Sequence, residues 1–315
     1  MFKIKPQGTF TTDIMLIQPQ LKYSAFLIFL ILTFASSKAN ALVQANKNIV
    51  DFKNIKEYAN LANAAYKNLT NLNNTKTFKR NLLTHHSTIP EIKISYFLTT
   101  NNKIKTQNIA VRGTTNIENT LVNLSLKLTL DKHTGVYLHK GFLHAAQEIY
   151  NEIKPKIKLG YTINTTGHSL GGAIALILAM QLDSDKYKIG QVITFGQPKV
   201  TNITGAYKFQ HLNIIRVVTA KDIIPLVPFI DPMDINNLDI YWHQGKEIIL
   251  LADSRYAVLK GLNSMLRATK FTQQPLDENN FKKHQMTQYL IMLNKKIPNA
   301  KLVPFKNNLN LFNLF

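Results

Sequence analysis

Apolar side chains recur along this chain with two different periods, and segments of the two kinds alternate. Residues 50–68, 141–153 and 284–293 carry apolar positions three and four residues apart, which is typical of amphipathic helices. The segment 172–182, GAIALILAMQL, is apolar on every side. We therefore expect a buried helix there.

Short runs rich in β-branched residues lie between these helical segments and predict strands. Two of them, residues 92–99 and 105–113, flank Asn101 and Asn102, so they predict a hairpin. Four further runs are of the same kind: 161–166, 191–196, 214–220 and 246–252. The alternation of strands and helices predicts an α/β fold, with a mostly parallel central sheet flanked by helices.

The first 41 residues differ from the rest of the chain. Lys22 precedes an apolar run at 24–35, and the small-residue triplet Ala39-Asn40-Ala41 follows. This order is typical of a secretory signal peptide, and the run is shorter than the roughly 18 to 20 residues that span a bilayer. We expect cleavage after Ala41, with Met15 as an alternative start, and export to a secreted or periplasmic location.

The remaining residues, 42–315, carry no internal repeat or linker, so they predict one domain with a loosely ordered tail from about residue 298. The chain has no cysteine, which excludes disulfides and thiolate chemistry. Its formal net charge of +20 favours anionic surfaces. The basic residues are scattered and lack the aromatic interleaving of a nucleic-acid site, so we expect no nucleic-acid partner and infer no protein partner.

Ser169 is the first candidate for chemistry. It lies in Gly167-His168-Ser169-Leu170-Gly171, a G-x-S-x-G pattern that can be an ordinary turn or a strained turn that exposes a nucleophile. A predicted strand precedes it and a predicted helix follows it. That context favours the nucleophile, because the serine then projects from the sheet edge at a helix start.

A serine nucleophile needs a histidine base and an acid that orients the histidine. Asp222 follows a predicted strand at the expected edge, whereas Asp231, Asp234 and Asp239 fall in an irregular loop. Only His243 and His284 lie beyond Asp222. His243 precedes the strand that should follow the acid and suits a structural role, while His284 follows that strand and is favoured as the base.

An oxyanion also needs two hydrogen-bond donors. The candidates are the backbone N–H of Leu170 and the backbone N–H and hydroxyl of Thr114, which directly follows the 105–113 run. The segment after Thr114 predicts a short amphipathic helix, either packed permanently on the body or acting as a lid at a lipid surface. The lid positions are Asn116, Ile117, Leu121, Val122 and Leu124.

The chain resembles the class 3 lipases, which are α/β-hydrolases of the fungal-lipase type. The resemblance runs from about Ala59 to Leu290 through LANAAYKN, AVRGTTNIENTLVNL, HKGF, TGHSLGGAIA, TFGQPKVTN, RVVTAKDIIPLVP and YWHQGKEI, in the family's order. It implies Ser169, Asp222 and His284 as the catalytic triad, Thr114 and Leu170 as oxyanion donors, and residues 116–124 as the lid. His243 stands where the family keeps a non-catalytic histidine.

The resemblance implies an exported serine carboxylic-ester hydrolase acting on lipids at an interface, with acylglycerols as the leading substrates. A phospholipase A1 acting on anionic membranes, a short-chain esterase and a non-catalytic lipid-binding module are the alternatives. Neither a cofactor nor a metal is implied. The pair His85-His86 is expected on an exposed loop.

Overall fold

A computed structural model of the chain describes residues 50–68, 81–90, 92–114, 127–228, 241–267 and 282–305. The expected signal peptide (1–41), the expected lid (116–124) and the loop with Asp231, Asp234 and Asp239 lie outside these residues. Within the described part, no helix has the length and apolar character needed to cross a membrane. The residues from Phe52 onward cluster as one compact unit.

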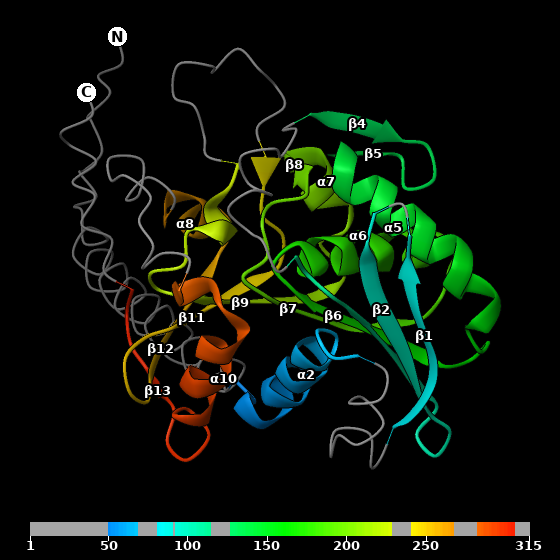
Figure 1. Ribbon diagram of the computed structural model, residues 1–315. Coiled ribbons are helices and arrows are strands. Elements are labelled where there is room, and N and C mark those ends of the chain that lie inside the picture. The colour runs from blue at the N-terminus through cyan, green and yellow to red at the C-terminus, as the bar shows by residue number, and fades with distance from the viewer. Residues whose placement is uncertain are drawn as a thin grey trace, which may run out of the picture. The chain divides into compact units, whose positions relative to one another are not determined.

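A nine-stranded sheet forms the centre of this unit, in the order β1-β2-β3-β6-β7-β9-β11-β12-β13 (Figure 1). Its strands are β1 (Leu82–Ile89), β2 (Ile94–Asn101), β3 (Thr106–Val111), β6 (Thr162–His168), β7 (Ile189–Phe195), β9 (Asn213–Thr219), β11 (Lys246–Leu250), β12 (Arg255–Lys260) and β13 (Lys301–Leu302). The five neighbours from β3 to β11 run parallel. The mostly parallel sheet predicted from the sequence is therefore confirmed, and so is the hairpin of β2 and β3.

Helices cover both faces of this sheet. The long ones are α2 (Phe52–Ala64), α5 (Lys140–Ile153), α6 (Leu170–Ser184) and α10 (Met286–Asn294). Helix α2 packs against β6, β7 and α10, while α6 packs between the sheet and α5 (Figure 1). Neighbouring residues in a strand point to opposite faces of the sheet. Phe97 and Ala110 belong to the hydrophobic cluster under α2, while Leu98 and Ile109 belong to the one under α6.

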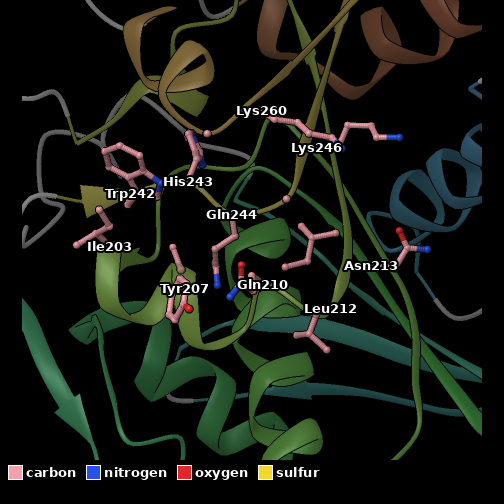
Figure 2. Close-up of a pocket in the computed structure, with 14 residues that line it drawn as sticks. Ile203, Tyr207, Gln210, Leu212, Asn213, Trp242, His243, Gln244, Lys246 and Lys260 are labelled. Carbon is pink, nitrogen blue, oxygen red and sulfur yellow. The ribbon is translucent and has the colours of Figure 1, made fainter. Parts of the chain in front are cut away.

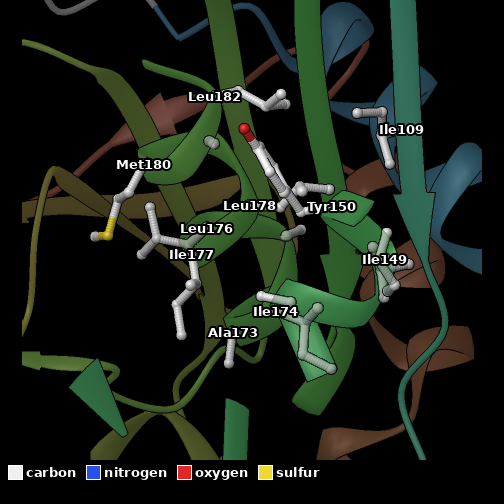
Figure 3. Close-up of a cluster of buried hydrophobic side chains, with 14 of the residues drawn as sticks. Ile109, Ile149, Tyr150, Ala173, Ile174, Leu176, Ile177, Leu178, Met180 and Leu182 are labelled. Carbon is white, nitrogen blue, oxygen red and sulfur yellow. The ribbon is translucent and has the colours of Figure 1, made fainter. Parts of the chain in front are cut away.

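Helix α6 is the centre of the larger core, as its uniformly apolar sequence predicted. Figure 3 shows Ile174 and Leu178 of α6 beside Ile149 and Tyr150 of α5, with Ile109 on the neighbouring strand. Every residue from Gly171 to Leu182 is buried. Burying an aliphatic side chain stabilises a fold by about 1.5 to 3 kcal/mol. Helix α6 is therefore held firmly in the core, and it fixes the position of Ser169, the residue before it.

A second, four-stranded sheet, in the order β10-β8-β5-β4, was not predicted. It consists of β4 (Leu128–Asp131), β5 (Val136–His139), β8 (Thr201–Asn202) and β10 (Tyr241–Trp242), and the short helix α7 (Ile203–Lys208) follows β8. The remaining short elements are the 3-10 turns η2 (Lys154–Lys156) and η3 (Ile224–Leu226) and the helix α8 (Leu262–Leu266). Two-residue strands carry too little periodicity to be recognised in a sequence.

One expectation was wrong. His85 and His86 are not on a loop but within β1, where His85 Nε2 lies 2.9 Å from Glu152 of α5. Within the described part of the tail that starts at about residue 298, Lys301 and Leu302 pair with β12. In both cases the partner is remote in sequence, so the local pattern gave no signal.

Candidate active site

Ser169 lies on the sharp turn between β6 and α6. Its backbone has φ 58° and ψ −131°, outside the regions that non-glycine residues ordinarily adopt. Such a conformation costs about 1 to 3 kcal/mol and persists only where the surroundings impose it. Here the N–H of Ser169 donates to the carbonyl of Phe195 on β7 at 2.8 Å, and α6 is held by its buried core.

Gly171 allows this turn to sit close to the neighbouring strand. A Cβ on Gly171 would lie 2.3 Å from the carbonyl oxygen of Val111 and 2.6 Å from the carbonyl carbon of Arg112. No side chain fits there, so the first turn of α6 packs directly on the backbone at the end of β3. The glycine of the motif thus serves close packing between the helix and the strand.

Asp222 and His284 meet beside this turn. Asp222 lies three residues beyond β9 and is fully buried, and its Oδ2 accepts from the Nδ1–H of His284 at 2.8 Å. The hydroxyl of Tyr289, from α10, donates to the same oxygen, and the N–H of Ile224 donates to Oδ1 at 2.9 Å. The carboxyl group is therefore held on both oxygens, and it fixes the ring of His284 with Nε2 free to accept a proton.

The ring of His284 lies next to the serine turn. Its centroid is 4.5 Å from that of His168, the residue before Ser169. Ser169 Oγ and His284 Nε2 are both buried, and neither has a hydrogen-bond partner among the described residues. Catalytic hydrogen bonds are often incomplete before substrate binds, so the open Oγ and Nε2 atoms are compatible with a nucleophile and its base.

His168 links this turn to the backbone of the histidine, a role that the sequence did not suggest. Its Nε2–H donates to the carbonyl oxygen of His284 at 2.6 Å, and its Nδ1 accepts from the hydroxyl of Tyr66 at 2.8 Å. Burial lowers the pKa of His168 to about 3, with a smaller contribution from His284. The ring is thus neutral, and its one proton is fixed on Nε2.

The candidate oxyanion donors lie in segments that adjoin Ser169. A Cβ on Gly113 would be 3.2 Å from the Cβ of Ser169, so the loop carrying Thr114 borders the serine. Leu170 is the first residue of α6, and its N–H has no acceptor one turn earlier in the helix. The segment that should form the lid begins two residues after Thr114, at Asn116, beyond the described part.

His243 lies apart from this cluster. It is buried, and its Nε2 donates to the carbonyl of Pro225, a bond of the kind expected for a structural histidine. Burial, followed by the charge of Arg216, holds its pKa well below the ordinary value. Two aspartates at the end of α6 are paired outside this cluster. Asp183 contacts His211, and Asp185 contacts Lys154 and His133.

No group of three or more His, Asp or Glu side chains in the described residues could hold a metal ion. The polar groups of the site suit proton transfer and stabilisation of an anion: an acid, a histidine, a serine and a backbone N–H at a helix start. The fold is that of an α/β-hydrolase, and serine, acid and histidine follow one another in the chain order of that fold.

Comparison with known proteins finds similarity in the middle of the chain. Residues 108–231 match the model of the family described as lipase (class 3). This segment includes Ser169 and Asp222 and ends before His284. The chain is 34% identical over 116 residues to secreted mono- and diacylglycerol lipase 1 of Fusarium solani, covering 35% of this chain and 34% of that protein. It is 31% identical over 140 residues to a lipase of Rhizopus niveus, covering 40% and 36%.

The matched segments thus span about a third of the length of these curated relatives. Among solved structures, lipase II from Rhizopus niveus superposes with a TM-score of 0.56 at 24% identity, covering 64% of this chain and 81% of that one. At this identity the likeness supports the fold, and the roles of individual residues rest on the geometry described above.

Proposed function

We propose that this protein is an exported serine hydrolase that cleaves carboxylic esters of acylglycerols. The observation that carries the proposal is the buried hydrogen bond from His284 to Asp222 beside a strained Ser169 whose hydroxyl has no partner among the described residues. These groups, on a turn at the sheet edge, are what acyl transfer to a serine requires.

In the proposed reaction, His284 Nε2 takes the hydroxyl proton as Ser169 Oγ attacks the ester carbonyl. The oxyanion is bound by the N–H groups of Leu170 and Thr114, and the protonated His284 then gives its proton to the departing alcohol. Water, activated by the same histidine, hydrolyses the acyl-enzyme. Asp222 holds the imidazole and stabilises its charged form.

Acylglycerols are the proposed substrates because the relative from Fusarium solani is named for monoacyl and diacyl substrates. That name also supports export, in line with the signal-like residues 1–41. Residues 116–124 are proposed as a lid over the site. The net charge of +20 supports one second candidate, hydrolysis of anionic phospholipids at the membrane surface.

The test compares hydrolysis of tributyrin, triolein, a monoacylglycerol and phosphatidylglycerol by the purified protein and by Ser169→Ala. Loss of a triad nucleophile costs about 10⁶ in turnover. Ser184→Ala is the matched control, since Ser184 lies at the far end of α6 and its hydroxyl donates to the carbonyl of Met180 one turn earlier. Equal activity of Ser169→Ala and the parent would refute the mechanism. Faster cleavage of phosphatidylglycerol than of every acylglycerol would favour the second candidate.

A further inference from the structure

The amino-terminal edge of the central sheet carries a group of exposed aliphatic side chains. Leu159 precedes β6 and is 85% exposed, Ile104 lies in the turn between β2 and β3 and is 63% exposed, and Leu82 begins β1 and is 66% exposed. They are three of the four most exposed large hydrophobic side chains among the described residues. Single exposed apolar side chains are common, but several at one edge are typical of an interaction surface.

Hydrogen bonds hold the segments of this edge against one another. The N–H of Thr162 donates to the carbonyl of Lys105 at 2.9 Å. Lys158 Nζ and the hydroxyl of Tyr161 both donate to Asn102 Oδ1, at 3.1 and 3.0 Å. The turn between β2 and β3 therefore lies beside the segment that leads into β6, and β1 pairs with β2 next to it. The three aliphatic side chains thus belong to one surface.

Exposed lysines surround these aliphatic side chains. The segment that leads into β7 adjoins β6, because the N–H of Ile163 donates to the carbonyl of Lys188 at 2.8 Å. The acidic side chains at the end of α6 are paired elsewhere, and no salt bridge between described residues involves a lysine of this surface. The exposed lysines of the three segments are Lys103, Lys105, Lys156, Lys158, Lys186 and Lys188.

The positive charge continues along the same edge to the next strands. Figure 2 shows Asn213 at the start of β9, and Lys246 and Lys260 on β11 and β12, at the border of a cavity of about 570 Å³. Lys246 begins β11 and pairs with Lys260 at the end of β12, an arrangement that is unfavourable for like charges. An anionic surface lying along this edge would relieve such repulsion between neighbouring lysines.

This edge is opposite the one that carries Ser169. Strand β6 runs from Thr162 to His168, the residue before Ser169 (Figure 1). Its seven residues, at about 3.3 Å each, separate the two edges by roughly 20 Å. A flat surface bound at the amino-terminal edge is therefore not the surface from which Ser169 takes an ester.

We propose that this edge docks on an anionic lipid bilayer, with Leu159 and Ile104 inserted between lipids and the lysines bound to their phosphates. Both parts add to the affinity: inserted side chains bury apolar area, and each lysine near an anionic bilayer strengthens binding by about fivefold. A nucleic acid would pair with the lysines but leave the aliphatic side chains exposed. Docking holds the protein at the bilayer with Ser169 directed away from it, and it does not require the serine centre to be active.

A single fluorescent label makes the test local, because the chain has no cysteine and an introduced thiol is unique. Leu159→Cys is made in the Ser169→Ala protein and labelled with an environment-sensitive dye. Ile291→Cys is the control, since Ile291 is also exposed but lies on α10, outside this surface. We expect a blue shift of the label at 159 with vesicles of equal parts phosphatidylcholine and phosphatidylglycerol. Neither vesicles of phosphatidylcholine alone nor the label at 291 should give that shift.

Sedimentation with the same vesicles measures binding of further variants, each verified as folded by thermal melting. Ile104→Gln/Leu159→Gln and Lys103→Gln/Lys156→Gln should each weaken binding by at least about tenfold. Their matched controls, which change exposed residues outside this surface, should bind like the parent: Ile203→Gln/Ile291→Gln and Lys132→Gln/Lys295→Gln.

The proposal is overturned if the label at 159 does not shift, if both labels shift equally, or if phosphatidylcholine alone binds as tightly. It is also overturned if only the lysine variant binds more weakly, a result that would indicate a polyanion as the partner. All measurements use protein without the serine hydroxyl, so none of these outcomes bears on the proposed hydrolysis.

Discussion

The Nε2 atom of His168 lies 2.6 Å from the carbonyl oxygen of His284, so the residue before the candidate nucleophile holds the backbone of the candidate base. The hydrogen bond thus joins two residues that are 116 positions apart in the sequence. Tyr66 completes the link by donating to His168 Nδ1. The link makes His168 a positioning residue: it contacts the turn and the base and takes no part in the bond changes.

His168→Leu should lower kcat by about 10- to 100-fold with little change in KM, because displacing a catalytic group by about 1 Å costs on that order. His168→Gln keeps a donor at the position of Nε2 and should recover most of this loss. Steady-state kinetics on a soluble ester measure both variants. A parallel rise in KM, or equal defects in the two variants, would contradict the positioning role.

His168 should also make the protein sensitive to acid. The pKa of His168 is about 3 in the folded protein, against an ordinary value of 6.5, because of burial. Between these values the unfolded chain binds a proton that the folded protein does not, so stability falls as the pH drops from 6.5 towards 3. Above pH 6.5 this contribution is fully present.

Denaturant unfolding of the parent and of His168→Gln at pH 7.5 and pH 4.5 measures this effect. The parent should lose roughly 3 kcal/mol more than the variant on acidification, at about 1.4 kcal/mol per pH unit between pH 6.5 and pH 4.5. Other histidines titrate in both proteins and cancel in the difference. Identical losses of stability in the two proteins would show that folding does not lower the pKa of His168.

Gly196, directly after β7, should be essential for the position of His284. Its φ is 59°, and a Cβ there would lie 2.7 Å from Cε1 of the His284 ring. Gly196→Ala should therefore reduce activity by at least about tenfold beyond its effect on stability. Gly160 has a similar φ of 77° with nothing within 4 Å of its Cβ position, so Gly160→Ala carries the backbone strain alone. Matching activities of the two folded variants would refute the prediction.

Substitution of the two histidines beyond Asp222 should have different effects, one on activity and the other on stability. His284→Ala should abolish measurable ester hydrolysis while the protein stays folded, because the proton acceptor is removed. His243→Ala should mainly lower the melting temperature, since His243 bonds the carbonyl of Pro225 in a buried place. Hydrolysis assays and thermal melting of both variants test this. Normal activity of His284→Ala would mean that another residue is the base.

Local sequence already determines much of this protein. The serine turn was predictable because strand, glycine pair and apolar helix are adjacent in the chain, and short-range geometry alone directs the serine outward. Asp222 followed from the same logic, since residues that end parallel strands share one edge of the sheet. The order of helices and strands gave the α/β class, and the buried face of α6 could be read from its uninterrupted apolar run.

Tertiary structure decided what depends on partners remote in the chain. His168 became a link between turn and base only because the chain returns at His284 and Tyr289 to the ends of β6 and β9. The four-stranded sheet likewise joins Leu138, Thr201 and Trp242 from segments far apart in the chain. The physical reason is that hydrogen bonds and charges act over a few ångströms of space, whereas sequence periodicity reports only on neighbours along the chain.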